Sequence, residues 1–419
     1  MNWKKTTRLA LALASCFVAA AQAQTVTLDG PLTHFFGIGP NSNHGNMTAC
    51  GYKHASQSTA GCGTVAPYGA WLDGPMNPYR LNGHTYFQLP HSENFRIKVP
   101  GNYWGGPTTW VMEGTAQSGA AMTPAQRDQD ESHYNNRNWI FGVYNEQNTL
   151  YALTHHEWYP SATTINAIPG FNPNPVQRWI AGIGWAKSTD GGASWALRPV
   201  SEGSSRMVLV PQPSSSGPNV LTYGFMHPSN LVKEGAYYYA FTSTDNQGPN
   251  GRVAGVALVR TDDLTSPVGW EYWNGSGWTQ VNHLTYQGNF GPQMPYVFWA
   301  QPNDCSHLYA MNVRRHKGSG KWITLGSKWC LPAPPQGQEF RYQAVYSWTQ
   351  SLANPVDLEG HLQDVQQNGV SLLSNNYYSF FDVDGTADDN YQSVGDHPLL
   401  VVSKDGNTYH HQFLTLTGF

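Results

Sequence analysis

The chain alternates between short apolar or aromatic runs and clusters of turn-forming residues. It shows no heptads and no long helical periodicity, which favours a β-sandwich, a barrel or a propeller. One theme recurs: an apolar strand, a turn, a Tyr-rich strand and a strand that closes near a Trp. We assign it to five units, which cover residues 79–99, 149–160 with 179–195, 229–273, 307–329, and 375–385 with 398–413.

The spacing of these units predicts the architecture. They start roughly 70 to 80 residues apart, whereas a propeller blade usually takes about 40 to 50 residues, so long loops must connect them. Five units of four strands fit the length when those loops are included. We therefore expect an all-β protein, a β-propeller of five blades with four antiparallel strands each, as a single domain over residues 24–419.

Composition supports a turn-rich β protein and narrows its partners. Only 12% of the 419 residues are charged, against a usual share of about 25%. The net charge of −4 provides no basic surface, so nucleic acid is not expected as a partner. The 16 Trp and 23 Tyr residues either fill the core or form a sugar-binding surface, because aromatic faces cover the apolar faces of pyranose rings. Both interpretations stay open at this point.

The N-terminal residues are typical of an export signal. Lys4, Lys5 and Arg8 precede an apolar run over residues 9–23 that is too short for a membrane span. The sequence Ala-Gln-Ala at 21–23 predicts cleavage before Gln24, so residues 1–23 form a signal peptide. A lipobox ending at Cys16 is the alternative and would leave a lipid anchor. We expect a secreted or periplasmic monomer without a membrane-spanning segment.

Cleavage at this site leaves four cysteines, and an even number in an exported chain suggests disulfide bonds. Four cysteines allow three pairings. We predict the local one, Cys50–Cys62 and Cys305–Cys330, because the first pair brackets a Gly/Ser/Thr loop and the second a hairpin-like segment. Paired C-x-x-C spacing is absent from the sequence, so a zinc site is not expected.

The stretch STDGGASW at 188–195 has the pattern S-x-D-G-G-x-x-W, known as an Asp-box in sialidases and other propellers. We expect Asp190 to accept hydrogen bonds from the turn backbone, as in Asx turns, and Trp195 to pack beneath it. The motif then ties a hairpin and does not indicate sialidase activity. A sialidase also needs an arginine triad, a Tyr–Glu pair and several such boxes, and we identify one box.

The third unit contains HPSNLVKEGAYYYAFTS followed by VALVRTDDL. It resembles a blade of the five-bladed propeller glycosidases of the arabinanase, xylosidase and invertase type. The resemblance covers about two blades in detail and the remainder by general pattern. It implies an Asp base in the first blade, a tuning Asp in the second and a Glu acid in the third, all on innermost strands that face the axis.

Asp73 lies in WLDGPMNPYR, just before the first hairpin, where the resemblance implies the Asp base. A glycosidase uses two carboxylates, of which one is a general acid and the other a base or nucleophile. The alternative is a turn aspartate, because Asp-Gly is a strong turn dipeptide.

Glu157 stands among His155, His156, Trp158 and Tyr159 at the end of an apolar strand. A Glu against aromatic surface is expected to have a raised pKa, which suits a general acid. The alternative is an exposed strand end with a satisfied His–Glu pair. The position departs from the resembled pattern, which has an Asp in the second blade.

The third blade also departs from that pattern, because His227 and Asn230 stand where a carboxylate is expected. Asp245 follows the Tyr-rich strand and is a third catalytic candidate, with a turn as the alternative. The candidate substrate-binding residues are His91, His155, His156, Trp158, Tyr159, His227 and Arg341. No cofactor is expected to be required. Asp382 and Asp384 resemble part of a calcium loop without its later ligands, so a structural Ca²⁺ stays open.

Three functions fit these residues. The first is an exported glycoside hydrolase that acts on a polysaccharide or oligosaccharide. The second is a lectin-like propeller that binds carbohydrate without catalysis. The third is a polysaccharide lyase with His155 or His156 as base. The hydrolase requires Asp73 and Glu157 to converge, with carboxyl groups about 5 to 10 Å apart.

Overall fold

The computed structural model of the chain describes the following residues: 23–37, 47–50, 53–54, 57–58, 62–65, 74–90, 94, 96–99, 111–113, 137–158, 179–197, 207–209, 222–248, 251–281, 296, 298–299, 307–329, 342–374, 377–383, 388, 390–404 and 408–419. Within these ranges the regular structure is β-strand, apart from one short 3-10 helix at Glu359–His361. The predicted all-β class is confirmed.

Blade I begins with the hairpin that the sequence predicts. Asn82 and Gly83 both have positive φ, 51° and 76°, as a two-residue type I′ turn requires. The four strands pair antiparallel in chain order, and they are β7 (Asn77–Leu81), β8 (His84–Gln88), β9 (Arg96–Val99) and β10 (Val111–Glu113). Outside them lie β3 (Met47–Cys50), β6 (Cys62–Val65) and the small hairpin of β4 (Lys53–His54) and β5 (Gln57–Ser58).

Blades II and III share one sheet, because the third strand of blade II pairs in parallel with the first strand of blade III. Blade II contains β11 (Arg137–Glu146), β12 (Thr149–Trp158) and β13 (Trp179–Ser188), with β14 (Ala196–Leu197) and β15 (Met207–Leu209) outside. Blade III contains β16 (Thr222–Pro228), β17 (Val232–Glu234), β18 (Tyr237–Gly248), β19 (Gly251–Thr261), β20 (Glu271–Trp273) and β21 (Trp278–Gln280).

Blades IV and V complete the ring, and the N-terminal strand closes it. Blade IV contains β22 (His307–His316), β23 (Trp322–Trp329), β24 (Tyr342–Thr349), β25 (Gln363–Asp364) and β28 (Leu373–Ser374). Blade V contains β29 (Tyr378–Phe381), β31 (Leu399–Lys404) and β32 (Thr408–Thr417), to which β1 (Thr25–Leu28) and β2 (Thr33–Gly37) are added. Three short strands join these blades, β26 (Gln366–Gln367), β27 (Val370–Ser371) and β30 (Ser393–Val394).

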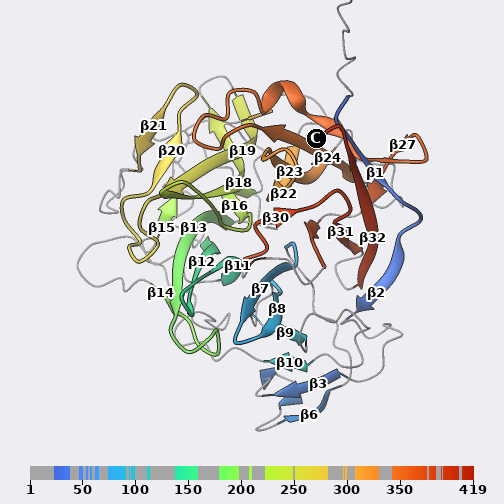
Figure 1. The fold of residues 1–419 in the computed structure, drawn as a ribbon. Coiled ribbons are helices and arrows are strands. Elements are labelled where there is room, and N and C mark those ends of the chain that lie inside the picture. The colour runs from blue at the N-terminus through green and yellow to red at the C-terminus, as the bar shows by residue number, and fades with distance from the viewer. Residues whose placement is uncertain are drawn as a thin grey trace, which may run out of the picture.

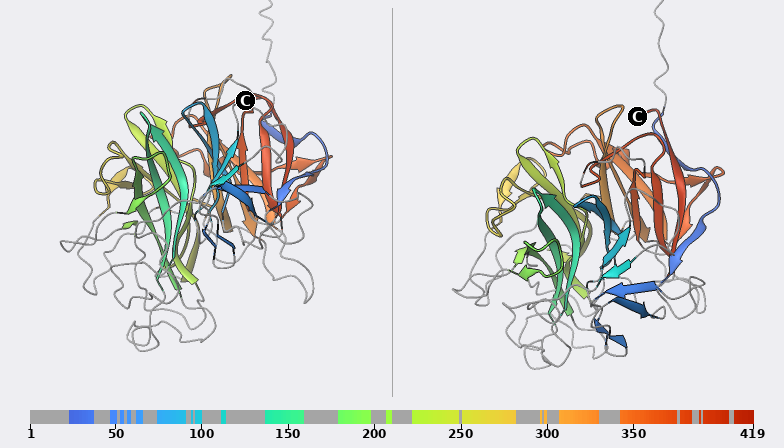
Figure 2. Two further views of the ribbon diagram at one scale, coloured as in Figure 1. Left: turned by 90° about the horizontal axis from the view of Figure 1, so that it is seen from below. Right: turned by 60° about the horizontal axis from the view of Figure 1, so that its bottom comes forward.

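The blades lie around a common axis, so the fold is a five-bladed β-propeller. In Figure 1 β30 is at the centre, and the innermost strands β7, β11, β16 and β22 lie around it. Figure 2 shows the blue strands of blade I between the long green strands of blade II and the red strands of the last blade. The apolar core is divided among adjacent blades, with separate clusters between I and II, II and III, III and IV, and IV and V. Sheet-on-sheet packing of this kind buries both faces of a blade.

Asparagine side chains form hydrogen bonds with peptide groups at the inner edges of these strands. An innermost strand has no partner on its axial side, so its peptide groups need other hydrogen bonds. Asn230 donates to the carbonyl of Val313 and accepts from the Val313 N–H, both at 2.9 Å. Asn94 binds the carbonyl of Asn138 at 2.7 Å and the N–H of Ile140 at 2.6 Å. A carboxamide thus replaces a neighbouring strand.

Residues 388 and 390–395, which lie between β29 and β31, bind all four other blades. In blade I, the Tyr391 hydroxyl lies 2.6 Å from that of Thr85, and in blade II, Asn390 makes two hydrogen bonds with the peptide groups of Asn145. Gln392 accepts from the N–H of Lys233 in blade III and offers its carbonyl to the N–H of Arg315 in blade IV. We call this segment the axial plug. It joins the blades at the end of the axis where β11 reaches Glu146.

Candidate functional site

Glu157 and His155 form a buried pair near the end of β12. They are two residues apart on one strand, so both side chains lie on the same face. Glu157 Oε1 is 3.3 Å from His155 Nε2, and the two residues are 3% and 0% exposed. Trp139 is directly opposite His155 on β11, and the two rings stack with centroids 4.9 Å apart. The buried carboxylate therefore lies beside an imidazole that stacks on Trp139.

His227 brings blade III into this cluster. It occupies a bulge in β16, between Met226 and Pro228, and has a left-handed φ of 48°. Its ring stacks on that of His155 with centroids 5.2 Å apart. Burial, together with the charge of His155, places the pKa of His227 well below its usual value. A strained backbone at a bulge is a recurrent feature of functional sites.

Phe141 connects the cluster to blade I. It also lies at a bulge, in β11, and its ring is 5.5 Å from that of His227 and 6.1 Å from that of His155. A Cβ added at Gly74 would collide with the Phe141 ring, so the backbone of residue 74 lies directly against it.

Blade V contributes Tyr377, which precedes β29 and lies edge-on to His227 with ring centroids 5.5 Å apart. Sequence analysis missed Tyr377, Trp139 and Phe141. For Trp139 and Phe141 the missing signal was the innermost strand of the second unit, which precedes the Tyr-rich hairpin and was not recognised. Tyr377 was recognised in the sequence only as a member of a Tyr-rich strand, and nothing marked it as a site residue.

The opposite face of blade II holds a second polar group. His156 is buried, and its Nε2 lies 2.5 Å from the hydroxyl of Thr154. A Cβ at Gly184 would overlap the His156 ring, so glycine provides the space for it. Asn138 lies directly opposite His156 in the β11–β12 register, which places both side chains on this face. The end of blade II thus has a carboxylate face and an amide–imidazole face.

The other site candidates are placed only partly. Asp73, His91, Tyr159, Arg341 and Asp384 lie outside the described residues. Trp158 ends β12, and only its backbone is described. Their roles stay predictions.

Asp245 belongs to β18, where its backbone, but not its side chain, is described. Register pairs connect Glu157 to Ala181, Ala181 to Gly224 and Gly224 to Asp245. Three strand spacings, roughly 14 Å along the sheet, therefore separate Asp245 from Glu157. Glycosidase carboxyl pairs are about 5 to 10 Å apart, so the backbone position of Asp245 does not suit a pair with Glu157.

The cysteines are consistent with local pairing without testing it. Cys50 on β3 and Cys62 on β6 are directly opposite each other in register, while their side chains lie outside the described set. Cys305 and Cys330 also lie outside it, two residues before and one residue after the register pair His307–Trp329. Both disulfides stay predictions.

The described residues contain no cluster of three or more His, Cys, Asp or Glu side chains that could hold a metal ion. Asp382, considered above for calcium, instead pairs with Lys317 at 2.6 Å and accepts from the N–H of Gly395. Among the described helices, none has the length and apolar character needed to cross a membrane.

The Asp190 turn lies at the other end of blade II. Its carboxylate accepts hydrogen bonds from the Ser188 hydroxyl at 2.8 Å and the Ser194 N–H at 2.9 Å, and Trp195 is buried below. Burial alone would raise the pKa of Asp190, but hydrogen bonds from Ser194 and Ser188 lower it. The geometry is that of a hairpin tie.

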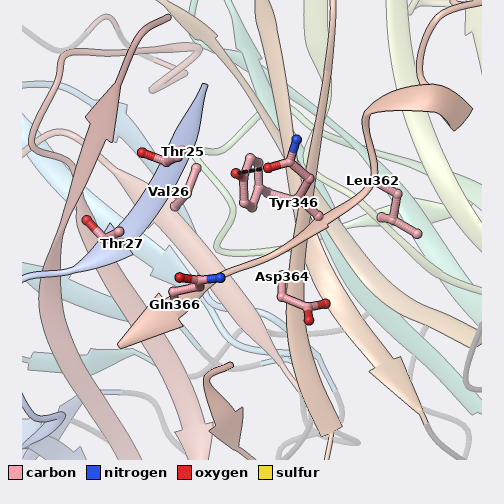
Figure 3. A pocket seen from close by; sticks show the side chains of 8 residues that line it. Thr25, Val26, Thr27, Tyr346, Leu362, Asp364 and Gln366 are labelled. Atoms are coloured by element: carbon pink, nitrogen blue, oxygen red, sulfur yellow. Dashed lines mark hydrogen bonds between the residues drawn. The ribbon is translucent and has the colours of Figure 1, made fainter. Parts of the chain in front are cut away.

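A pocket of about 370 Å³ lies between blades IV and V at the periphery (Figure 3). It is lined by Thr25, Val26, Thr27, Tyr346, Leu362, Gln363, Asp364 and Gln366. The Tyr346 hydroxyl binds the Gln363 carboxamide within it at 2.8 Å. None of the candidate residues lines this pocket, so we place the candidate site at the Glu157 cluster, where residues of several blades converge.

No protein family model matches the chain, and no curated protein is significantly similar in sequence. Several solved structures are similar in fold. The catalytic domain of a GH62 α-L-arabinofuranosidase from Coprinopsis cinerea is 11% identical, with a TM-score of 0.42 over 89% of this chain and 96% of that one. An α-L-arabinanase mutant from Cellvibrio cellulosa is 13% identical, with a TM-score of 0.39 over 83% and 92% of the two chains.

A GH32 β-fructofuranosidase from Bombyx mori is 13% identical, with a TM-score of 0.43 over 81% of this chain and 60% of that one. The chain therefore spans about three fifths of the length of that enzyme. At this level of identity none of these comparisons assigns an activity to the chain.

Proposed function

We propose that the protein is an exported glycoside hydrolase that acts on a polysaccharide or oligosaccharide, with Glu157 as general acid and Asp73 as base or nucleophile. The observation that carries the proposal is the buried Glu157–His155 pair within a cluster of residues from blades II, III and V. Gly74, next to Asp73, lies against Phe141 of the same cluster. Two carboxylates from different blades in one site are what glycoside hydrolysis requires.

The surroundings of Glu157 suit proton transfer. A general acid must give its proton to the departing glycosidic oxygen, and a nearby imidazole can exchange a proton with it. His155 Nε2 is at 3.3 Å, within reach for that exchange. The depressed pKa of His227 keeps this ring neutral at neutral pH, so stacking on His155 adds no second positive charge to the pair.

Export requires that the fold survive cleavage of the signal peptide. Cleavage before Gln24 would release residues 1–23 and leave β1, which starts at Thr25, as the outer strand of blade V. Cleavage at this position would therefore leave the strands of the propeller intact.

The test is Glu157→Gln with Glu146→Gln as matched control, because Glu146 is a carboxylate at the far end of the same blade. Released reducing ends are measured on arabinan, xylan and sucrose. We expect Glu157→Gln to keep the fold and lose about 10²- to 10⁴-fold in rate, with a smaller loss for substrates with good leaving groups. Asp73→Asn should slow both kinds of substrate alike. Equal, mild effects of Glu157→Gln and Glu146→Gln on the rate would contradict the proposed hydrolase mechanism.

A lectin-like function is the second candidate, and a specific observation favours it. At the candidate-site end, the described innermost strands carry no Asp or Glu, since β7 begins with Asn77, β11 contains Asn138 and Trp139, and β16 contains His227. The resemblance implies carboxylates on these strands. If the protein only binds sugar, the wild type will bind a member of the panel without releasing reducing ends or unsaturated products.

A further inference from the structure

Asn138 carries a carboxamide that makes no hydrogen bond. The residue is 2% exposed, and neither Oδ1 nor Nδ2 has a partner within the described part of the chain. A buried amide without partners is costly, so native structures contain few of them, and each calls for an explanation.

The other buried carboxamides of the described residues differ from Asn138, because each makes at least one side-chain hydrogen bond. They are Asn77, Gln88, Asn94, Asn145, Asn230, Asn312 and Asn390. Most of them join neighbouring blades, whereas the side chain of Asn138 joins nothing. Its conformation does not serve the fold.

The position of Asn138 is nevertheless well defined. Asn94 binds the Asn138 carbonyl and the Ile140 N–H, which holds this stretch of β11 in place. In register, Asn138 is opposite His156, and the preceding residue is opposite Glu157. Asn138 therefore shares a face of blade II with His156, a candidate substrate-binding residue, and Glu157 is on the other face. The unpaired amide lies at the same end of blade II as the proposed acid, on a rigid strand.

We infer that Asn138 is a ligand-binding residue at the candidate-site end of blade II, on the face that it shares with His156, and that its carboxamide binds two neighbouring hydroxyl groups of a sugar ring. The inference rests on the proposed carbohydrate ligand. A carboxamide offers one acceptor and one donor side by side, and two adjacent hydroxyls offer the complementary pair. Groups held in place before binding lose little conformational freedom when the ligand arrives, which favours affinity.

The first test measures stability, with Asn138→Leu compared against Asn230→Leu. Leucine has a similar size and no hydrogen-bonding groups. Asn138→Leu should leave the Tm unchanged or raise it, because no bond is lost. Asn230→Leu should lower the Tm by at least about 2 °C, because both peptide groups of Val313 lose their partners. A fall in Tm for Asn138→Leu as large as that for Asn230→Leu would show a structural role and overturn the inference.

The second test measures binding by calorimetry to arabinan, xylan and sucrose, in the Glu157→Gln background so that the ligand is not consumed. Asn138→Leu should weaken binding about tenfold or more. Unchanged binding would overturn this inference alone and leave the hydrolase proposal intact. Failure of the wild type and of Glu157→Gln to bind any member of the panel would instead overturn the proposed carbohydrate function, and with it this inference.

Discussion

Strand β11 connects two contrasting ends of the propeller axis. At its Glu146 end, Asn145 exchanges hydrogen bonds with Asn390 of the axial plug and donates to the carbonyl of Arg80. At its Arg137 end, Asn138 is buried with both side-chain polar atoms unpaired. The two asparagines are seven positions apart on one strand. The asparagine at the Glu146 end is fully paired, and we call this end the saturated end, whereas the side chain of the asparagine at the Arg137 end has no partner among the described residues.

The difference separates residues that build the fold from residues that are available for chemistry. At the plug, side chains of blade V bind three other blades and the backbone carbonyl of Gln392 binds the fourth, so these polar groups stabilise the ring. At the Glu157 end, His227 has a left-handed backbone and a depressed pKa, and Phe141 lies at a bulge. Local departures from the rules of folding concentrate where function needs them.

We expect the largest effect on stability from a substitution that removes hydrogen bonds at the saturated end. Asn390→Leu removes both hydrogen bonds to Asn145 and leaves its buried N–H and carbonyl without these partners. We expect the free energy of unfolding to fall by about 2 to 4 kcal/mol, measured by urea unfolding. Asn354→Leu, at an exposed position, is the control and should change it by less than about 0.5 kcal/mol. Similar values for the two variants would show that the plug does not hold the ring.

The sequence predicted the hairpins of the fold better than the innermost strands that surround its axis. The first, fourth and fifth units begin within about three residues of the innermost strands β7, β22 and β29. The second and third units begin at the next part of the blade and miss β11 and β16. Both strands contain a bulge, at Phe141 and at His227, which interrupts the alternation that would have marked them.

The candidate site was predictable only as far as its residues are neighbours in the chain. His155 and Glu157 stand in one short stretch, and the structure places their side chains in contact. Their stacking on Trp139 and His227 depends on strand register and on blade packing, which the sequence pattern did not define. The unpaired amide of Asn138 could not be predicted from the sequence, because a missing hydrogen bond is recognised only when the neighbouring residues are placed.

We expect a smaller effect on the free energy of unfolding from the titration of His227, which lies at the Glu157 end of the axis. The pKa of His227 is depressed by burial, so the unfolded chain binds a proton that the folded chain does not bind. Stability from this group is complete above the ordinary pKa of 6.5 and is lost as pH falls from there toward the folded pKa. The slope contributed by one such proton is at most about 1.4 kcal/mol per pH unit.

Urea unfolding between pH 5 and pH 8 measures this slope. His227→Gln should reduce it, because the glutamine side chain does not titrate. Equal slopes for wild type and His227→Gln would contradict a buried neutral imidazole at this position. The comparison between the two ends would then rest on hydrogen bonding alone.

The smallest effect is expected at the Asp190 turn, which lies at the saturated end although its motif is known from enzymes. Asp190→Ala removes acceptors for Ser188 and Ser194 at a mostly exposed position, so we expect a loss of about 0.5 to 1.5 kcal/mol in the free energy of unfolding and full activity. Because hydrogen bonds lower the Asp190 pKa, the loss should be complete above pH 3.8 and shrink as pH falls through the folded pKa. Asp262→Ala, in another exposed turn, is the control. A folded Asp190→Ala protein without turnover would place this turn in the functional site and remove the distinction between the two ends.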